Sequence, residues 1–217
     1  MKAGATLVSG APRRGILRPR LAARALARDD VLGPWVRHVG PLRIRKVTEG
    51  HFPYLVRSIL YQQLADKAAA AIHGRFVAAV GDVVTADSIL ATPEPDLRAA
   101  GLSRGKLAAV RDLALRAPEL RLEEVESLSD DEVVRRLTRV RGIGPWTAHM
   151  FLIFALRRGD VWPTGDLGVR MGYARVHGLG AAPTQKALLP LGERYRPWRS
   201  AAAWYFWRAL EVDPPSR

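Results

Sequence analysis

Helical periodicity dominates this chain of 217 residues and limits its fold more than any other feature. Strand signals are confined to residues 43–47 and 83–84, which are too short to build a sheet. Elsewhere apolar side chains recur at i, i+3, i+4 and i+7, the spacing of an amphipathic helix, as in Phe52, Leu55, Val56, Ile59, Leu60 and Leu64. The sequence therefore predicts an all-α fold. The other helical patterns cover residues 95–102, 103–117, 129–137, 145–157, 183–189 and 196–210.

Positive charge is the most informative property of the composition. Lys and Arg number 34 against 21 Asp and Glu, which gives a net charge of +13. This excess is typical of a nucleic-acid-binding protein, although RNA or an anionic membrane would also attract it. Residues 1–28 contain seven of the Lys and Arg residues and no acid. We expect them to form a basic, partly disordered N-terminal tail, either simply solvated or acting as an arm that steers DNA.

Several classes of protein are disfavoured by what the sequence lacks. It contains no Cys, which excludes disulfides, thiolate zinc sites and an iron–sulfur cluster. The longest apolar run, Met150–Leu156, is far shorter than the ~18 residues of a membrane span. With no secretory signal pattern, we expect a cytoplasmic protein, associated with the nucleoid if the source is bacterial. The His residues show no metal-ligand spacing, and we expect structural or solvated roles for His38, His51, His73, His149 and His177.

A glycine turn joins two of the predicted helices. The first helix ends near Leu137, the turn contains Gly142 and Gly144, and Pro145 begins the second helix. Glycine permits positive φ angles, and the free N–H groups at the start of the second helix can bind a phosphate. This pattern predicts a helix–hairpin–helix motif over about residues 130–157. An ordinary corner between two helices is the alternative.

A lone carboxylate, Asp166, follows the hairpin. A helix over residues 145–157 carries the chain roughly 18 Å away at ~1.5 Å per residue. Residues 158–165, at up to ~3.3 Å each, can bring it back. Asp166 can therefore face the same cleft as the hairpin. It is also suited to cap a helix that begins at Leu167, and the two roles are compatible.

Five segments in order along the chain carry further information: "SILYQQLADKAA" (58–69), "GLSRGKLAAVRDLA" (101–114), "GIGPWTA" (142–148), "PTGDLGVR" (163–170) and "RPWRSAAAWYFW" (196–207). Together they resemble the helix–hairpin–helix DNA glycosylases, and within them the AlkA-type 3-methyladenine DNA glycosylases. The resemblance extends over about residues 50–210. It implies a two-lobed helical fold over residues 29–217, with an active-site cleft between the lobes around residues 146–166. The N-terminal β-domain of larger members has no counterpart in the residues before Phe52.

The activity implied by this resemblance is hydrolysis of the N-glycosidic bond of an alkylated base that is flipped out of duplex DNA. Asp166 matches the catalytic carboxylate, which would stabilise an oxocarbenium-like sugar or activate the attacking water. A cationic base such as 3-methyladenine or 7-methylguanine leaves as a neutral molecule and needs no second acid. Bifunctional relatives carry a Lys where this chain has Trp146. The resemblance therefore implies a monofunctional enzyme that requires no cofactor.

The resemblance also implies an aromatic base pocket. Trp146 and Trp207 match its walls, where an indole face would attract a cationic base by roughly 0.5–2 kcal/mol, although core packing is the alternative for both. For Trp204 we favour the core. Met150 replaces a tyrosine of some members, which leaves the lesion open. Hypoxanthine, ethenoadenine, 1-methyladenine and 3-methylcytosine are alternatives to 3-methyladenine and 7-methylguanine.

Contacts with double-stranded DNA follow from the same resemblance. Gln63 aligns best with the side chain that fills the gap left by the flipped base; the alternative is that Leu64 belongs to the core and the glutamines to an exposed face. The hairpins of the family also bind a monovalent cation, Na⁺ or K⁺, through backbone carbonyls, here those of Thr138, Val140 and Ile143. We expect a monomer. A non-catalytic helix–hairpin–helix DNA-binding protein is the competing interpretation. The implied DNA-binding residues are Gln62, Gln63, Leu64, Ser103, Lys106, Gly142, Gly144 and Thr147.

Overall fold

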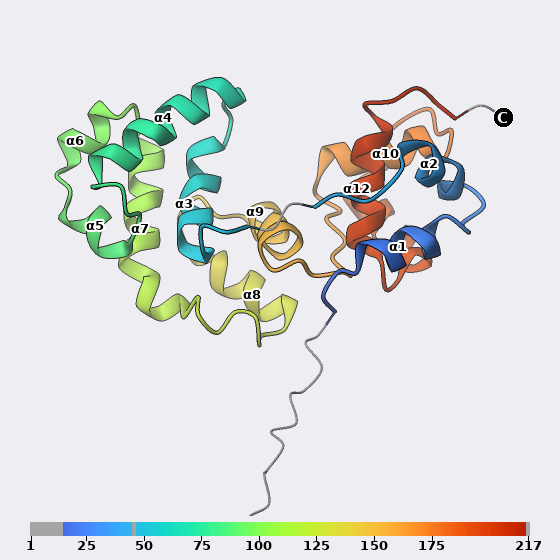
Figure 1. Ribbon diagram of the computed structural model, residues 1–217, viewed down its shortest axis with the longest axis horizontal. Helices are drawn as coiled ribbons and strands as arrows, with labels where there is room; N and C mark the ends of the chain where they lie inside the picture. Colours follow the sequence, from blue (N-terminus) through green and yellow to red (C-terminus); the bar gives the residue numbers. More distant parts are fainter. Residues whose placement is uncertain (1–14, 45–46, 216–217) are drawn as a thin grey trace, which may run out of the picture.

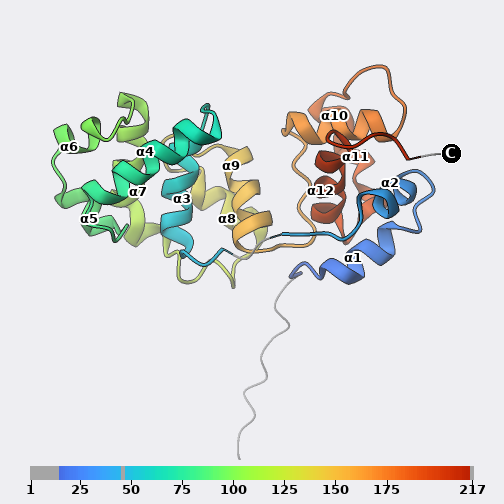
Figure 2. The same cartoon turned by 45° about the horizontal axis from the view of Figure 1, so that its top comes forward.

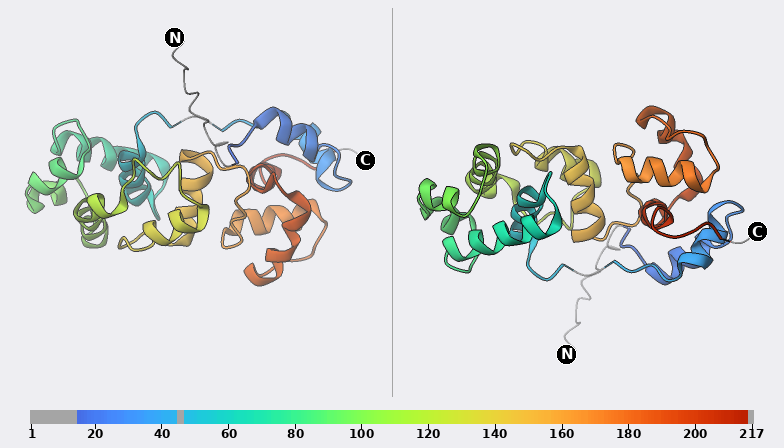
Figure 3. Two further views of the ribbon diagram at one scale, coloured as in Figure 1. Left: turned by 90° about the horizontal axis from the view of Figure 1, so that it is seen from below. Right: turned by 90° about the horizontal axis from the view of Figure 1, so that it is seen from above.

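The computed structural model describes residues 15–44 and 47–215. Within these ranges all regular elements are helical, apart from one isolated bridge between Ile16 and Arg158, which confirms the all-α prediction. The helices gather in two lobes that the chain connects by extended segments (Figures 1, 2 and 3). No helix among the described residues is long and apolar enough to cross a membrane.

The larger lobe, residues 47–161, contains the hairpin and is called the hairpin lobe below. Its core is almost entirely aliphatic, with Phe76 and Phe151 as its fully buried aromatic residues. The predicted amphipathic face of residues 52–60 supplies its centre. Its elements are α3 (His51–Tyr61), α4 (Asp66–Ala79), α5 (Ala86–Ala91), α6 (Glu94–Ala99), α7 (Arg104–Leu120), α8 (Asp130–Leu137), α9 (Pro145–Met150) and the π-helix η1 (Phe151–Ala155).

The smaller lobe combines residues 15–44 with residues 162–215 and is called the terminal lobe. Its core is rich in aromatic rings, which include Trp35, Trp162, Tyr173, Tyr195 and Phe206. Helices α10 and α12 pack so closely that a Cβ atom on Gly172 would lie 2.0 Å from the carbonyl oxygen of Phe206. The elements are α1 (Pro19–Leu26), α2 (Leu32–Val39), α10 (Leu167–Val176), α11 (Gln185–Leu191), the 3₁₀-helix η2 (Glu193–Tyr195) and α12 (Arg199–Ala209).

Helix α1 differs from the expected N-terminal tail. Residues 19–26 form a helix that buries Ala22 and Leu26 in the terminal lobe. Its arginines lie between small apolar residues, so its apolar face is narrow and the positive charge dominates the sequence pattern. The structured part of the chain therefore begins well before residue 29. Residues 1–14, the rest of the expected tail, lie outside the described residues.

The helix after the hairpin also differs from the expected continuous helix over residues 145–157. After six residues of α-helix, α9 widens into the π-helix η1, and Arg157 ends it with a left-handed φ of 53°. A π-turn inserts one residue into the helical ladder, and such turns occur frequently at functional sites. Here the segment carries Phe154, whose ring stacks on Trp207 of the terminal lobe.

Candidate active site

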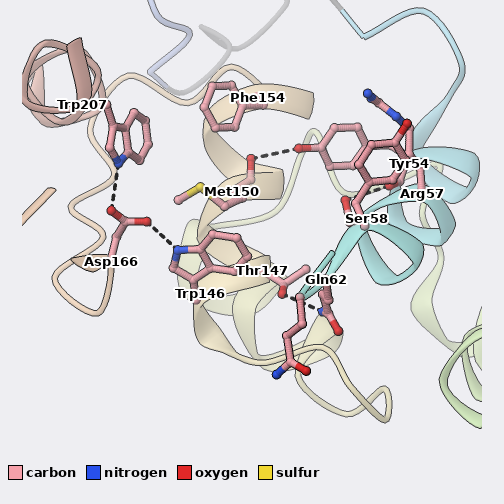
Figure 4. A pocket seen from close by; sticks show the side chains of 12 residues that line it. Tyr54, Arg57, Ser58, Gln62, Trp146, Thr147, Met150, Phe154, Asp166 and Trp207 are labelled. Carbon is pink, nitrogen blue, oxygen red and sulfur yellow. Dashed lines mark hydrogen bonds between the residues drawn. The ribbon is translucent and has the colours of Figure 1, made fainter. Parts of the chain in front are cut away.

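A cavity of about 720 Å³ opens between the two lobes (Figure 4). The hairpin lobe contributes most of its wall through α3, the residues that follow it, α9 and η1, whereas Asp166 and Trp207 come from the terminal lobe. The structure thus brings together the residues predicted for catalysis and for the pocket. The lining residues are Tyr54, Arg57, Ser58, Tyr61, Gln62, Gln63, Trp146, Thr147, Met150, Phe154, Asp166 and Trp207.

Asp166 is buried, with 8% of its surface exposed, and its carboxylate is held by three N–H donors. Oδ1 accepts hydrogen bonds from the backbone N–H of Val169 (2.7 Å) and from Nε1–H of Trp207 (2.8 Å). Oδ2 accepts from Nε1–H of Trp146 at 2.6 Å. The carboxylate therefore caps α10 and faces the cavity at the same time. Hydrogen bonds to a charged acceptor stabilise its negative charge.

The two indoles that hold Asp166 also form cavity walls. Trp207 is partly buried and stacks on Phe154 with ring centroids 5.8 Å apart and an angle of 24° between the planes. Trp146 is 48% exposed, so it is a wall of the cavity and not a core residue. Met150 lines the cavity as predicted. Trp204 packs against the terminal core, as expected.

Three aromatic residues of the cavity were missed by the sequence analysis: Tyr54, Tyr61 and Phe154. Tyr54 lies against the backbone of the opposite wall, where its hydroxyl donates to the Met150 carbonyl at 3.5 Å. Burial raises the pKa of Tyr54 to about 12. Met150 therefore does not leave the cavity without a tyrosine, because α3 supplies two.

A second periodic pattern on α3 could have identified this wall. The same i, i+3, i+4, i+7 spacing as in the core residues, displaced around the helix, is found in Tyr54, Arg57, Ser58 and Tyr61. The guanidinium of Arg57 lies 4.9 Å from the ring centre of Tyr61. The helix therefore has one aliphatic face in the core and one aromatic and polar face in the cavity.

The hairpin forms where it was predicted, between α8 and α9. Gly142 has a φ of +79°, which favours glycine, but Gly144 has a φ of −92° and serves as the N-cap of α9. The positive φ that glycine permits is therefore used at Gly142 but not at Gly144. Thr147, in the first turn of α9, is buried and points its hydroxyl toward Gln62.

The predicted cation ligands Thr138, Val140 and Ile143 line one hollow of about 590 Å³ at the hairpin. The Val140 carbonyl already accepts the N–H of Ile143 at 3.1 Å, which leaves it one lone pair for a further ligand. The hard carbonyl oxygens of this set suit a monovalent cation. Arg116, Arg139 and Arg141 also line the hollow and disfavour a cation, and the carboxylate of Asp112 in the same lining offsets part of their positive charge. Among the described residues, no cluster of His, Asp and Glu could hold a metal ion.

The predicted DNA-binding residues outside the hairpin have internal partners. Ser103 caps α7 by accepting the backbone N–H of Lys106 at 3.2 Å. The Lys106 amine donates to the Leu60 carbonyl at 2.6 Å, and Gln62 donates to the Gly142 carbonyl at 2.9 Å. Leu64 is 38% exposed, so its assignment to the core is wrong. Contact of these residues with DNA stays a prediction.

Comparison with known proteins adds independent information. The model of the HhH-GPD superfamily base excision DNA repair proteins matches residues 56–197. DNA-3-methyladenine glycosylase 1 of Schizosaccharomyces pombe is 39% identical over 184 residues, which are 82% of this chain and 81% of the relative.

Two solved structures resemble the whole fold. The S. pombe 3-methyladenine DNA glycosylase in complex with abasic DNA superposes with a TM-score of 0.79 at 34% identity, covering 91% of this chain and 100% of that one. A DNA-3-methyladenine glycosidase from Bacillus halodurans has a TM-score of 0.81 at 31% identity, covering 90% of both chains. The matched region contains the hairpin and Asp166. This chain therefore belongs to the HhH-GPD superfamily of base excision DNA repair proteins.

Proposed function

We propose that the protein is a monofunctional DNA glycosylase that removes alkylated bases of the 3-methyladenine and 7-methylguanine type from double-stranded DNA. One observation carries this proposal: a buried carboxylate, held by three N–H donors, faces an aromatic cavity large enough for a flipped base. The S. pombe relative is named a 3-methyladenine DNA glycosylase and the B. halodurans relative a DNA-3-methyladenine glycosidase, which supports the substrate class.

The cavity suits a base that is extruded from the duplex. Trp146, Trp207 and Tyr54 present π-faces and ring edges to an entering ring (Figure 4), and π-faces attract cations. The negative charge of Asp166 stabilises the positive charge that develops on the sugar as the bond between C1′ and the base nitrogen breaks. Water adds to C1′ and loses a proton, and the cationic base leaves with the bonding electrons as a neutral molecule.

Backbone cleavage is not part of the proposal. A lyase of this superfamily needs an amine to form a Schiff base with the sugar, and the residues that line the cavity, all of them described, include no lysine. Trp146 occupies the position at which bifunctional relatives carry their lysine. The amine of Lys106 is engaged with the Leu60 carbonyl.

Three smaller expectations accompany the proposal. The carbonyls of Thr138, Val140 and Ile143 would hold a Na⁺ or K⁺ ion, which would link the hairpin to a DNA phosphate. The protein would act as a monomer in the cytoplasm, and it would associate with the nucleoid if the source is bacterial. Duplex DNA is the expected partner, consistent with the abasic DNA bound by the S. pombe relative.

The decisive experiment measures release of free base from alkylated duplex DNA by wild type and by Asp166→Asn, with DNA affinity measured on the same samples. Asp82→Asn is the matched control, because Asp82 is exposed, lies outside the cavity and has a left-handed φ of 64° that Asn tolerates. Removing a stabilising charge should lower the rate about 10²–10³-fold, with unchanged affinity. Asp82→Asn should behave as wild type.

The other outcomes identify the alternatives. Base release by Asp166→Asn at the wild-type rate would show that Asp166 is not catalytic. If wild type releases no alkylated base, duplexes with hypoxanthine, ethenoadenine, 1-methyladenine and 3-methylcytosine test the other lesions. DNA binding without any release indicates a non-catalytic binding protein, and strand nicking without alkali or heat would contradict the monofunctional assignment.

A further inference from the structure

The loop between α3 and α4, residues 62–65, is called the wedge loop here. It is short and projects two exposed side chains, Gln63 and Leu64, beside the cavity. Gln63 has a left-handed φ of 57°, which is unusual for a residue with a side chain and indicates that the surroundings fix the backbone. A loop of this kind needs restraints on both sides.

Two side chains supply these restraints. On one side, the Lys106 amine from the first turn of α7 donates to the Leu60 carbonyl at the end of α3. On the other side, the side-chain amide of Gln62 donates to the Gly142 carbonyl at 2.9 Å and to the Thr147 hydroxyl at 3.4 Å. Gln62 therefore ties the wedge loop to the glycine turn of the hairpin, which lies 80 residues further along the chain.

We infer that Gln62 is a positioning residue: it acts as a strut that fixes the wedge loop to the hairpin, so that Gln63 and Leu64 are the side chains that enter the base stack. This inference rests on the proposed function, because it concerns how the damaged base is extruded. The amide hydrogens of Gln62 are both used within the protein, which leaves its side-chain oxygen as the remaining group for DNA.

The physical need for a strut follows from the forces on the loop. A side chain that enters the duplex separates stacked bases at a cost of a few kcal/mol per step, and the stack pushes back on the loop. A free four-residue loop would yield. Because the hairpin is expected to hold the phosphate backbone, the link through Gln62 sets the depth of insertion relative to that anchor.

The test replaces Gln62 with Met, which keeps the length of the side chain but removes its donors. Gln63→Met is the matched control, with the same chemical change one residue further along. Hydrogen exchange of residues 61–66 is measured in the free protein. Insertion is followed by the fluorescence of 2-aminopurine placed beside a stable abasic-site analogue in a duplex. Excision under single-turnover conditions and affinity for undamaged duplex complete the set.

For Gln62→Met we expect faster exchange in the wedge loop, a weaker 2-aminopurine signal and about tenfold slower excision, with affinity for undamaged duplex within about twofold of wild type; a tenfold change is ~1.4 kcal/mol. Gln63→Met should leave the exchange of the loop unchanged. Thr147→Val removes the longer of the two bonds and should produce a smaller effect in the same direction, and the double variant should be no worse than Gln62→Met alone.

Unchanged loop exchange together with lost affinity for DNA would overturn the inference, because it would mean that Gln62 contacts DNA directly. A loosened loop with a wild-type 2-aminopurine signal would also overturn it, since the strut would then not serve insertion. Failure of the proposed function is a separate result. If wild type releases no base at all, the exchange and 2-aminopurine measurements still decide on the strut.

Discussion

The two lobes of the molecule differ in composition and in what they give to the site. The hairpin lobe has an aliphatic core and carries the elements expected to contact DNA, which are the wedge loop and the hairpin. The terminal lobe has an aromatic core in which α10 and α12 touch through Gly172. It supplies the carboxylate of Asp166, at the N-cap of α10.

This difference indicates that the two lobes contribute different kinds of group to the site. The carboxylate proposed to be catalytic lies at the start of a helix in a tightly packed lobe, and a catalytic group of this kind has to be pre-organised. The groups proposed to contact DNA lie on turns of the other lobe. The connection is made by two indoles, because Trp146 of the hairpin lobe and Trp207 of the terminal lobe both donate to Asp166.

Gly172→Ala should have the largest effect, because it attacks the packing of the terminal lobe. The new Cβ atom would meet the backbone of Phe206, and backbone atoms cannot move aside without separating α10 from α12. We expect a loss of about 3 kcal/mol in the free energy of unfolding. This corresponds to a thermal midpoint lower by about 6–12 °C in a chain of this size, measured by circular dichroism.

The control for this substitution is Gly105→Ala in the first turn of α7, where a Cβ atom would meet only the Ser103 hydroxyl at 4.0 Å. Its thermal midpoint should stay close to that of wild type. Excision by Gly172→Ala should also fall, since α10 carries Asp166. A Gly172→Ala protein that melts within 2 °C of wild type would show that α10 and α12 tolerate separation and that the terminal lobe is less rigid than proposed.

Trp207→Phe and Trp146→Phe compare the two lobes directly. Each removes one N–H donor to Asp166 and keeps an aromatic ring. We expect about tenfold slower excision for Trp207→Phe, which is ~1.4 kcal/mol, a typical value for a hydrogen bond to a charged group. Trp146→Phe should cost only about two- to threefold, because Trp146 is half exposed and water can replace its N–H group.

Single-turnover excision and DNA affinity, measured for both tryptophan variants, separate the contribution of each lobe. The affinity for undamaged duplex should be unchanged in both variants, since the substitutions act on the carboxylate. If Trp146→Phe is slower than Trp207→Phe, the hairpin lobe, and not the terminal lobe, sets the position of the catalytic charge.

Local signals made much of the molecule predictable. The apolar spacing of residues 52–60 and the Gly-Ile-Gly turn act within a few residues, and they gave the helices and the hairpin correctly. The approach of Asp166 to Trp146 followed from helix rise and the length of the return segment, and the hydrogen bond between them lies where these lengths allow. Such predictions depend only on chain geometry.

The remaining features depend on contacts that leave no local pattern. Lys106 and Gln62 appeared to be free for DNA, but their partners are backbone carbonyls 46 and 80 residues away. Leu64 continues the apolar spacing of α3, yet the helix ends at Tyr61 and the left-handed turn at Gln63 directs the next residue outward. The aromatic face of α3 was visible in the spacing, but the stronger aliphatic pattern masked it.

Gly74→Ala should have the smallest effect, and it tests whether the two lobes unfold together. Gly74 lies within α4 of the hairpin lobe, where a Cβ atom would meet nothing within 4 Å. Alanine should stabilise this helix by about 0.5–1 kcal/mol without changing excision, and raise the thermal midpoint by about 1–4 °C. That rise requires the lobes to unfold as one cooperative unit, because a first transition confined to the terminal lobe would not respond to α4. If the first midpoint is unchanged in Gly74→Ala but lowered in Gly172→Ala, the terminal lobe, which carries Asp166, unfolds first and is the less stable of the two. Its rigidity would then be local to α10 and α12.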